Sequence, residues 1–225
     1  MTTCRNIKVA ALDIDGVLVR DTFSPVIKLF VESKGGTYDA DVETNVFSRA
    51  RKDATAYLNG RLSLNMSHDA ILAEYFSMRK AYIETHGGGP MPGLKDFLKL
   101  LQNCGLKLLC YGGLDFQYFA HEMGAFLGDF SFEKYVCTND FRPGVVEIIA
   151  RVGGKPHEVL FVDDVDLVAQ ACKASLAPFI GWPSTSFQQQ AMQKTGVKHF
   201  VKSLGEIDSA LIKRIDNAAP NHGGW

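Results

Sequence analysis

The chain lacks the long apolar runs of a membrane protein and the charge excess of a protein that binds polyanions. Its longest apolar stretches, such as residues 106–111, fall far short of the roughly 20 residues that one bilayer crossing needs. Lys and Arg number 24 against 25 Asp and Glu, so the net charge of -1 provides no broad attractive field. We therefore expect neither nucleic acid nor a membrane as a partner, and any anion site must be local.

Paired cysteines are missing as well. The five cysteines are odd in number, show no Cys-x-x-Cys spacing and lie mostly inside apolar stretches. Buried thiols in a reducing compartment fit this pattern better than disulfides or a zinc site. Because residues 1–6 do not begin a signal peptide, we expect a cytoplasmic protein.

The composition and the apolar pattern indicate a packed protein of strands alternating with helices. With 225 residues, 46% of them hydrophobic, the chain suits one large domain and a smaller one. Short apolar runs predict strands at residues 7–12, 106–111, 135–138 and 159–162, and weaker ones at 178–181 and 198–201. Helical patterns cover residues 94–103, 144–152, 166–174, 186–194 and 204–215. This alternation predicts an α/β fold with a parallel sheet covered on both faces.

One segment interrupts the alternation with helices alone. Ser24 and Pro25 form a helix start, and further helical patterns run over residues 39–57 and 67–83. The glycine- and proline-rich stretch 87–93 that follows has the character of a hinge. A small helical unit is thus expected inside the larger domain. The expected division is a core of residues 1–19 and 90–216, an inserted helical unit of residues 20–89, and a frayed tail of residues 217–225.

Acidic side chains follow the expected strands at the ends where ligands bind in open parallel sheets. Asp13 and Asp15 come after the first strand, Asp163 and Asp164 after the fourth, and Arg142 lies in the loop after the third. Carboxylates gathered in one crevice repel one another unless a cation lies among them. Because the available ligands are oxygens, with no His or Cys in these loops, the four aspartates predict a Mg²⁺ site.

These residues resemble a known family. The run Asp13-Ile14-Asp15-Gly16 after an apolar strand, with Asp163-Asp164 ending a late strand, is similar to the haloacid dehalogenase superfamily over essentially the whole chain. The resemblance implies a Rossmann-like core, with the helical insertion as a cap domain between the first and second motifs. It also implies that Asp13 attacks phosphorus to give an aspartyl-phosphate, while Asp15 protonates the leaving group and later activates water. Dehalogenating members lack the second aspartate, so its presence favours phosphoryl chemistry.

The remaining motifs depart from the family pattern. The second motif normally ends its strand with Ser or Thr, whereas this chain has Gly112 at that position, followed by Gly113, and the backbone N–H groups of the two glycines could cradle a phosphate. The third motif normally has Lys before Pro, and Arg142 takes that place, which keeps the charge and adds a planar fork. In the fourth motif, Val168 stands where many members have a further acid.

The cap supplies candidates for substrate recognition, and the whole pattern predicts an activity. Most basic residues of the insertion belong to solvated helix faces, and Arg49 and Arg61 are the candidates for contact with the substrate away from its phosphate. We expect a Mg²⁺-dependent phosphatase of a small phosphorylated metabolite, with Arg142 offsetting charge on the phosphoryl group. Two alternatives remain open. One is a non-catalytic member that binds a phosphorylated ligand or a partner protein, and the other is a phosphomutase.

Overall fold

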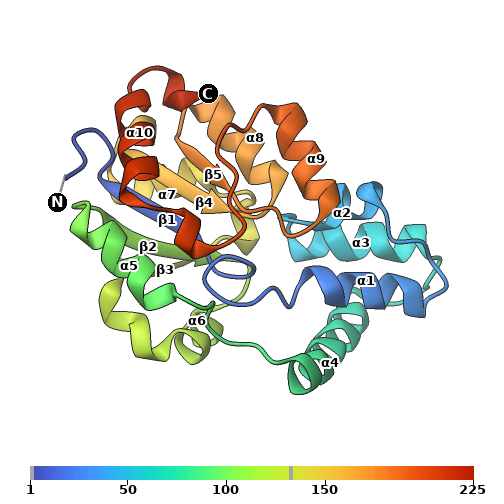
Figure 1. Ribbon diagram of the computed structural model, residues 1–225. Coiled ribbons are helices and arrows are strands. Elements are labelled where there is room, and N and C mark those ends of the chain that lie inside the picture. The colour runs from blue at the N-terminus through green and yellow to red at the C-terminus, as the bar shows by residue number, and fades with distance from the viewer. Residues whose placement is uncertain (1–2, 132–133) are drawn as a thin grey trace.

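The computed structural model describes residues 3–131 and 134–225. Residues 1–2 of the expected core segment 1–19, and residues 132–133 of segment 90–216, lie outside this part. A five-stranded parallel sheet with the strand order β3-β2-β1-β4-β5 forms the centre of the molecule (Figure 1). The strands are β1 (Val9–Asp13), β2 (Lys107–Gly112), β3 (Tyr135–Cys137), β4 (Val159–Asp163) and β5 (Phe179–Gly181).

The central strands are buried along their whole length because helices cover both faces of the sheet. Every residue of β1 and β4 is buried, as the unbroken apolar runs predicted. The expected sixth strand at residues 198–201 is reduced to a single parallel bridge between Gly181 and Phe200. Its polar start, Lys198 and His199, is only half buried or exposed, so the sheet ends there.

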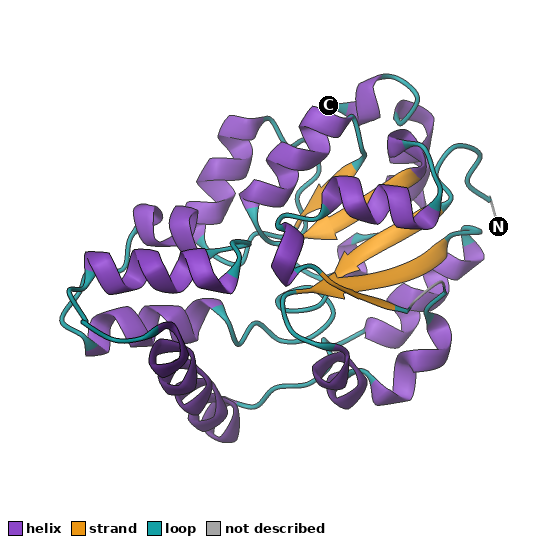
Figure 2. Ribbon diagram, turned by 180° about the vertical axis from the view of Figure 1, so that it is seen from behind, coloured by secondary structure: helices purple, strands orange, loops and turns teal. Residues whose placement is uncertain are grey.

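Six helices cover the two faces of the sheet (Figure 2). On one face lie α5 (Leu94–Asn103), α6 (Phe116–Glu122) and α10 (Ser209–Ala218), and on the other α7 (Val145–Val152), α8 (Asp166–Ser175) and α9 (Ser186–Thr195). The helix expected over residues 204–215 is instead a 3-10 turn at Leu204–Glu206 followed by α10. Asp208 makes this break, because its side chain accepts a hydrogen bond from the Leu211 backbone at 2.7 Å and caps α10.

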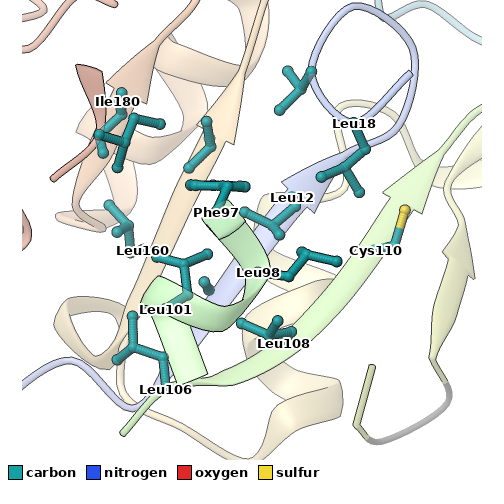
Figure 3. Packing of buried hydrophobic residues seen from close by; sticks show 14 of the residues in the cluster. Leu12, Leu18, Phe97, Leu98, Leu101, Leu106, Leu108, Cys110, Leu160 and Ile180 are labelled. Carbon is teal, nitrogen blue, oxygen red and sulfur yellow. The ribbon is translucent and has the colours of Figure 1, made fainter. Parts of the chain in front are cut away.

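Helix α5 shows how the core is built. Its residues Phe97, Leu98 and Leu101 recur on one side of the helix and pack over Leu12 of β1 and Leu108 of β2 (Figure 3). All five side chains are buried, and each contributes roughly 1.5–3 kcal/mol relative to an exposed position. This packing fixes the ends of β1 and β2, from which the acidic loops emerge.

Four helices lie beyond the carboxyl ends of the strands, to which the strand arrowheads point in Figure 2. They are α1 (Ser24–Ser33), α2 (Ala40–Val46), α3 (Arg51–Arg61) and α4 (His68–His86), and they share a separate apolar core that includes Phe30 and Ile71. The pattern expected over residues 39–57 divides into α2 and α3 because Phe47 is extended and Ser48 has a positive φ of 53°. No helix of the described residues is long and apolar enough to span a membrane.

The two connections between the helical insertion and the sheet run side by side. The Arg20 N–H donates to the Gly89 carbonyl at 3.0 Å, and the Met91 N–H donates to the Leu18 carbonyl at 2.8 Å. Val19 and Pro90 form an antiparallel bridge between these bonds. The stretch 87–93, which was expected to be a hinge, is therefore held against residues 18–20 by backbone hydrogen bonds. The domain boundaries at residues 19/20 and 89/90 stay a prediction.

The last residues differ from the expected frayed tail. The Trp225 ring stacks on Phe179 at 6.1 Å between centroids, and its Nε1 donates a hydrogen bond to the Ala177 carbonyl at 2.9 Å. Ala219 is fully buried. One large aromatic side chain at the terminus is enough to hold this segment against β5, despite its glycines and polar residues.

Candidate active site

A cavity of about 130 Å³ lies where the strand ends meet the helical insertion. The core side contributes acidic and basic groups, and the insertion contributes mostly apolar side chains. The core residues that line the cavity and were expected at the site are Asp13, Asp15, Gly113, Arg142, Asp163 and Asp164. With Arg49 from the insertion, the structure thus brings together seven of the nine residues expected from the sequence.

Gly16 allows the first and fourth acidic loops to approach each other. Its φ of +85° lies in the left-handed region, and a Cβ atom there would stand 2.8 Å from Asp164 Oδ2. Only glycine satisfies both conditions without a shift of the Asp164 carboxylate. The Asp-x-Asp-Gly turn therefore puts Asp13, the last residue of β1, in the same cavity as Asp164.

The cavity holds an excess of negative charge. Burial raises the pKa of Asp13 well above its ordinary value, and the charges of Asp163, Asp164 and Asp15 raise it further, while Arg142 opposes the shift. Burial also raises the pKa of Asp164, with Asp163 as the next cause. Raised pKa values of this kind are expected where carboxylates are buried close together without a bound cation. A bound divalent ion would relieve this repulsion.

The donor set fits Mg²⁺ held by few protein ligands. In residues 3–131 and 134–225, no three His, Cys, Asp or Glu side chains form a ready-made metal cage. Mg²⁺ does not need one, because it commonly binds one or two carboxylates and completes its shell with water and substrate phosphate. Asp13 and Asp164 are the carboxylates that suit this role, since both line the cavity and both show raised pKa values.

Both carboxylate oxygens of Asp163 accept hydrogen bonds from neighbouring protein groups. Its Oδ2 accepts a hydrogen bond from the Tyr111 hydroxyl at 2.5 Å, and its Oδ1 accepts one from the Val165 N–H at 2.8 Å. Burial raises the pKa of Asp163 to about 6, while these hydrogen bonds act in the opposite direction. Because both oxygens are engaged, the structure favours Asp164 over Asp163 as a metal ligand. No pattern in the sequence indicated the Tyr111 contact, which joins β2 to β4.

Two further residues that sequence reasoning missed hold Asp15. Its Oδ1 accepts hydrogen bonds from the Tyr118 hydroxyl at 2.7 Å and from Arg79 Nη2 at 3.0 Å. Arg79 comes from α4 of the insertion and is buried, with its Nε donating to Thr22 Oγ1 at 2.9 Å. A signal did exist: Arg79 lies eight residues after the buried Ile71, in register with the inward face of α4.

Gly113 and Arg142 lie in direct contact, so the arginine at residue 142 depends on a glycine at residue 113. A Cβ atom on Gly113 would lie only 2.0 Å from Arg142 Nη2, so the guanidinium fills the space of a side chain at residue 113. Arg142 Nη1 donates to Ser48 Oγ of the insertion at 3.3 Å. Its Nε is buried and has no hydrogen-bond partner among the described residues. An unpaired charged donor in a cavity is the mark of an anion site.

Gly112 differs from its expected role. A Cβ atom there would meet Ile14 Cγ2 at 2.5 Å, and the residue is absent from the cavity lining within the described part of the chain. Its carbonyl accepts hydrogen bonds from the backbone and side chain of Thr138. Gly112 therefore serves packing between β2 and β3, and Gly113 is the glycine that faces the cavity.

Arginines of the insertion divide into two groups. Arg49 lines the cavity as expected, and so does Arg51, which sequence reasoning did not select. Arg51 Nη2 donates to the Gly113 carbonyl at 2.6 Å, and its backbone N–H donates to Asn139 Oδ1 at 3.1 Å. Arg51 thus joins the insertion to the loops after β2 and β3 at the edge of the cavity.

Arg61 lies elsewhere, contrary to the expectation. Its guanidinium pairs with Asp39 at 2.7 Å and with Asp41 at 2.8 Å, on the outer surface of the insertion. It takes no part in the cavity lining among the described residues. The cause is the local acidic pair at the start of α2, which attracts this exposed cation.

The comparisons with known proteins decide the family. A model of the haloacid dehalogenase-like hydrolases matches residues 7–175, which is more than half of the chain. The chain belongs to the haloacid dehalogenase-like hydrolase family. This confirms the resemblance seen in the motifs, and the parallel sheet with its surrounding helices confirms the expected fold class. A search of curated proteins gave no significant match.

Solved structures of haloacid dehalogenase-like proteins share the fold over nearly the whole chain. A HAD hydrolase of family IA, variant 3, from Entamoeba histolytica is 13% identical with a TM-score of 0.71, covering 94% of this chain and 100% of its own. A HAD family hydrolase from Deinococcus radiodurans with bound phosphate and sodium is 18% identical with a TM-score of 0.62, covering 92% and 95%. A predicted phosphoglycolate phosphatase from Haemophilus somnus is 17% identical with a TM-score of 0.60, covering 89% and 96%.

Proposed function

We propose that this protein is a Mg²⁺-dependent phosphatase that hydrolyses a small phosphorylated metabolite through an aspartyl-phosphate on Asp13. The observation that carries the proposal is the buried Nε of Arg142, an unpaired cationic donor in the same cavity as Asp13, Asp15 and Asp164. A phosphate dianion is the ligand that satisfies such a donor beside a metal ion. The bound phosphate in the Deinococcus radiodurans hydrolase is consistent with this chemistry in a protein of the same fold.

In the first step, an oxygen of the Asp13 carboxylate attacks phosphorus and the bond from phosphorus to the leaving oxygen breaks. Asp15 gives its proton to that leaving oxygen. Because Tyr118 and Arg79 both bind Oδ1 of Asp15, Oδ2 is the oxygen that remains to carry this proton. The two donors therefore orient the acid toward the substrate.

In the second step, water attacks the phosphorus of the aspartyl-phosphate. Asp15 accepts a proton of this water, the bond from phosphorus to the Asp13 oxygen breaks, and inorganic phosphate leaves, with Asp13 restored as a carboxylate and Asp15 as the protonated acid. Arg142 contributes in both steps, because its guanidinium offsets the charge on the equatorial phosphoryl oxygens.

Mg²⁺ would be held by the Asp13 and Asp164 carboxylates, with the substrate phosphate and water completing its shell. When bound, the ion supplies positive charge that stabilises the transferring phosphoryl group. Asp163 supports the site indirectly by fixing the start of the loop that carries Asp164. The raised pKa values of Asp13 and Asp164 support this assignment, because burial and the charges of neighbouring carboxylates disfavour the ionised forms, which a bound cation would stabilise.

The complementarity of Gly113 and Arg142 argues against a non-catalytic member. Taken singly, a missing hydroxyl at residue 112 and an exchanged lysine look like losses, but the Arg142 guanidinium lies against the neighbouring Gly113 and brings several N–H donors to this part of the cavity. A charged donor thus replaces both groups.

The proposal keeps the cytoplasmic location expected from the sequence, since all five cysteines are free thiols.

A panel of phosphate esters, assayed for inorganic phosphate with Mg²⁺ and with EDTA, tests the proposal. We expect turnover that needs Mg²⁺ and that falls at least about 1,000-fold in Asp13→Asn, because the amide cannot form the phosphoenzyme. Asp140→Asn is the matched control, since Asp140 is exposed and forms no part of the described cavity lining. Turnover that survives Asp13→Asn contradicts the nucleophile assignment. An isomeric sugar phosphate as product, without phosphate release, identifies the phosphomutase alternative.

A further inference from the structure

The cavity has two chemically different ends. Its inner end carries the carboxylates and Arg142 of the core, and its outer end is formed by apolar side chains from all four helices of the insertion. Phe30 and Ile27 come from α1, Leu58 from α3, and Ile71, Leu72 and Phe76 from α4. A substrate whose phosphate lies at the inner end must place its leaving group among these side chains.

Most polar groups at the outer end are already engaged with the protein, and among the described lining residues the Arg49 guanidinium and the Tyr75 hydroxyl are the groups that remain. Thr55 Oγ1 donates to the Arg51 carbonyl at 2.9 Å and contacts His68 Nδ1 at 2.6 Å. Ser48 Oγ accepts from Arg142, and Arg51 donates to Gly113. Few partners therefore remain for the hydroxyl groups of a leaving group, and a hydroxyl buried without a partner is strongly disfavoured.

The size of the cavity sets a second limit. Its volume of about 130 Å³ is shared between the phosphoryl group and the leaving group. A cavity of roughly 150 Å³ lined by apolar side chains is known to hold one benzene molecule. The leaving group is therefore no larger than about one six-membered ring.

From these observations we propose that the leaving group of the substrate is an apolar alcohol of about one ring, and not a polyhydroxylated sugar. This inference rests on the proposed phosphatase function and names the substrate class of that same site. Burial of the ring against Leu72 and Phe76, which line the cavity and are only half-buried, supplies binding energy that is independent of the phosphate. The same burial excludes sugar phosphates, because each unpaired hydroxyl lowers their affinity.

Cyclohexylmethyl phosphate and glucose 6-phosphate form the decisive pair of substrates. Both carry a six-membered ring and release a primary alcohol, so they differ chiefly in the ring hydroxyls and not in leaving-group reactivity. We expect kcat/KM for cyclohexylmethyl phosphate to exceed that for glucose 6-phosphate by about 100-fold, as two unpaired hydroxyls would produce. Acetyl phosphate serves as a third substrate whose small leaving group does not need the outer end.

The outcomes separate this inference from the function on which it rests. If acetyl phosphate is hydrolysed with Mg²⁺ but glucose 6-phosphate equals or exceeds cyclohexylmethyl phosphate, or neither ring ester is turned over, the apolar leaving group is contradicted and the phosphatase stands. If no member of the series is hydrolysed, the proposed function fails and the inference falls with it.

A pair of matched variants locates the preference in the cavity. Leu72→Asn places an amide at the outer end, and we expect it to lower the ratio of the two kcat/KM values about tenfold. Leu29→Asn makes the same change on an exposed face of α1, where 43% of Leu29 is accessible, and should leave the ratio as it is. Thermal melts establish that both variants fold. An unchanged ratio in folded Leu72→Asn contradicts the placement of the ring, and the wild-type ratio tests the inference even if that variant does not fold.

Discussion

Serine at position 113 and lysine at position 142, introduced singly and together, test whether Gly113 and Arg142 act as a unit. Arg142→Lys removes the planar fork, and with it about one charge-assisted hydrogen bond to the phosphoryl group, worth about 1.5–3 kcal/mol. We therefore expect kcat/KM to fall roughly 10- to 150-fold. Gly113→Ser places a Cβ atom 2.0 Å from Arg142 Nη2 and should displace the guanidinium, with a loss of similar size.

The double variant Gly113→Ser/Arg142→Lys gives the refuting measurement. Lysine leaves space at residue 113, and the serine hydroxyl can then donate to the phosphate, so we expect the double variant to be about 5- to 30-fold more active than the product of the single effects predicts. Gly113→Ala/Arg142→Lys is the control, because it relieves the same clash without a hydroxyl and should recover less. Kinetics with one phosphate ester and thermal melts of all variants suffice. Additive losses would refute the view that the guanidinium replaces both family groups.

Three further predictions concern the surroundings of this pair. Arg79→Met removes one hydrogen bond that orients the Asp15 carboxylate, so kcat should fall about tenfold while KM for a small ester stays nearly constant. A change in KM alone would contradict the orienting role of Arg79. Gly16→Ala should lower the free energy of unfolding by about 1–3 kcal/mol, measured by urea denaturation, because of its φ of +85° and its 2.8 Å approach to Asp164 Oδ2; a loss under about 0.5 kcal/mol would contradict this. The raised pKa values of Asp13 and Asp164 mean that the metal-free folded state binds protons that the unfolded state has released. The contribution of these two carboxyl groups to stability is therefore fully present below the unfolded pKa of about 4 and is lost as the pH rises through the folded values. Mg²⁺ should thus raise the melting temperature more near pH 7.5 than near pH 5, and an equal shift at both would contradict the shared site.

The parts of the fold that could be predicted are those that local patterns encode. Unbroken apolar runs identified the strands of the sheet, and Asp13 and Asp164 follow from their positions at strand ends. The split between α2 and α3 was missed because it depends on the backbone at Phe47 and Ser48, where no proline or glycine marks the break. Trp225 was missed because its partner Phe179 is distant in the sequence.

The parts of the site that could not be predicted depend on contacts between distant residues. Asp15 meets Arg79 and Tyr118 across 64 and 103 positions of the chain, and no spacing rule links them. Arg61 looked suitable for the cavity until its acidic partners on the outer surface were visible. Compensation between Gly113 and Arg142 is equally a property of three-dimensional packing, because each departure alone reads as a loss.

Direct detection of a phosphoryl group on Asp13 tests the central claim most closely. The Asp15→Asn variant lacks the base for the second step, so the aspartyl-phosphate should accumulate when the enzyme is mixed with Mg²⁺ and acetyl phosphate, whose leaving group needs no proton, and quenched in acid. We expect peptide mass spectrometry to find one phosphoryl group on the peptide that contains residue 13. Because residue 15 is asparagine in this variant, Asp13 is the one aspartate left of the Asp-x-Asp pair. Phosphate release by the wild type, with no phosphoryl group on Asp13 in this variant at any quench time, would contradict the mechanism.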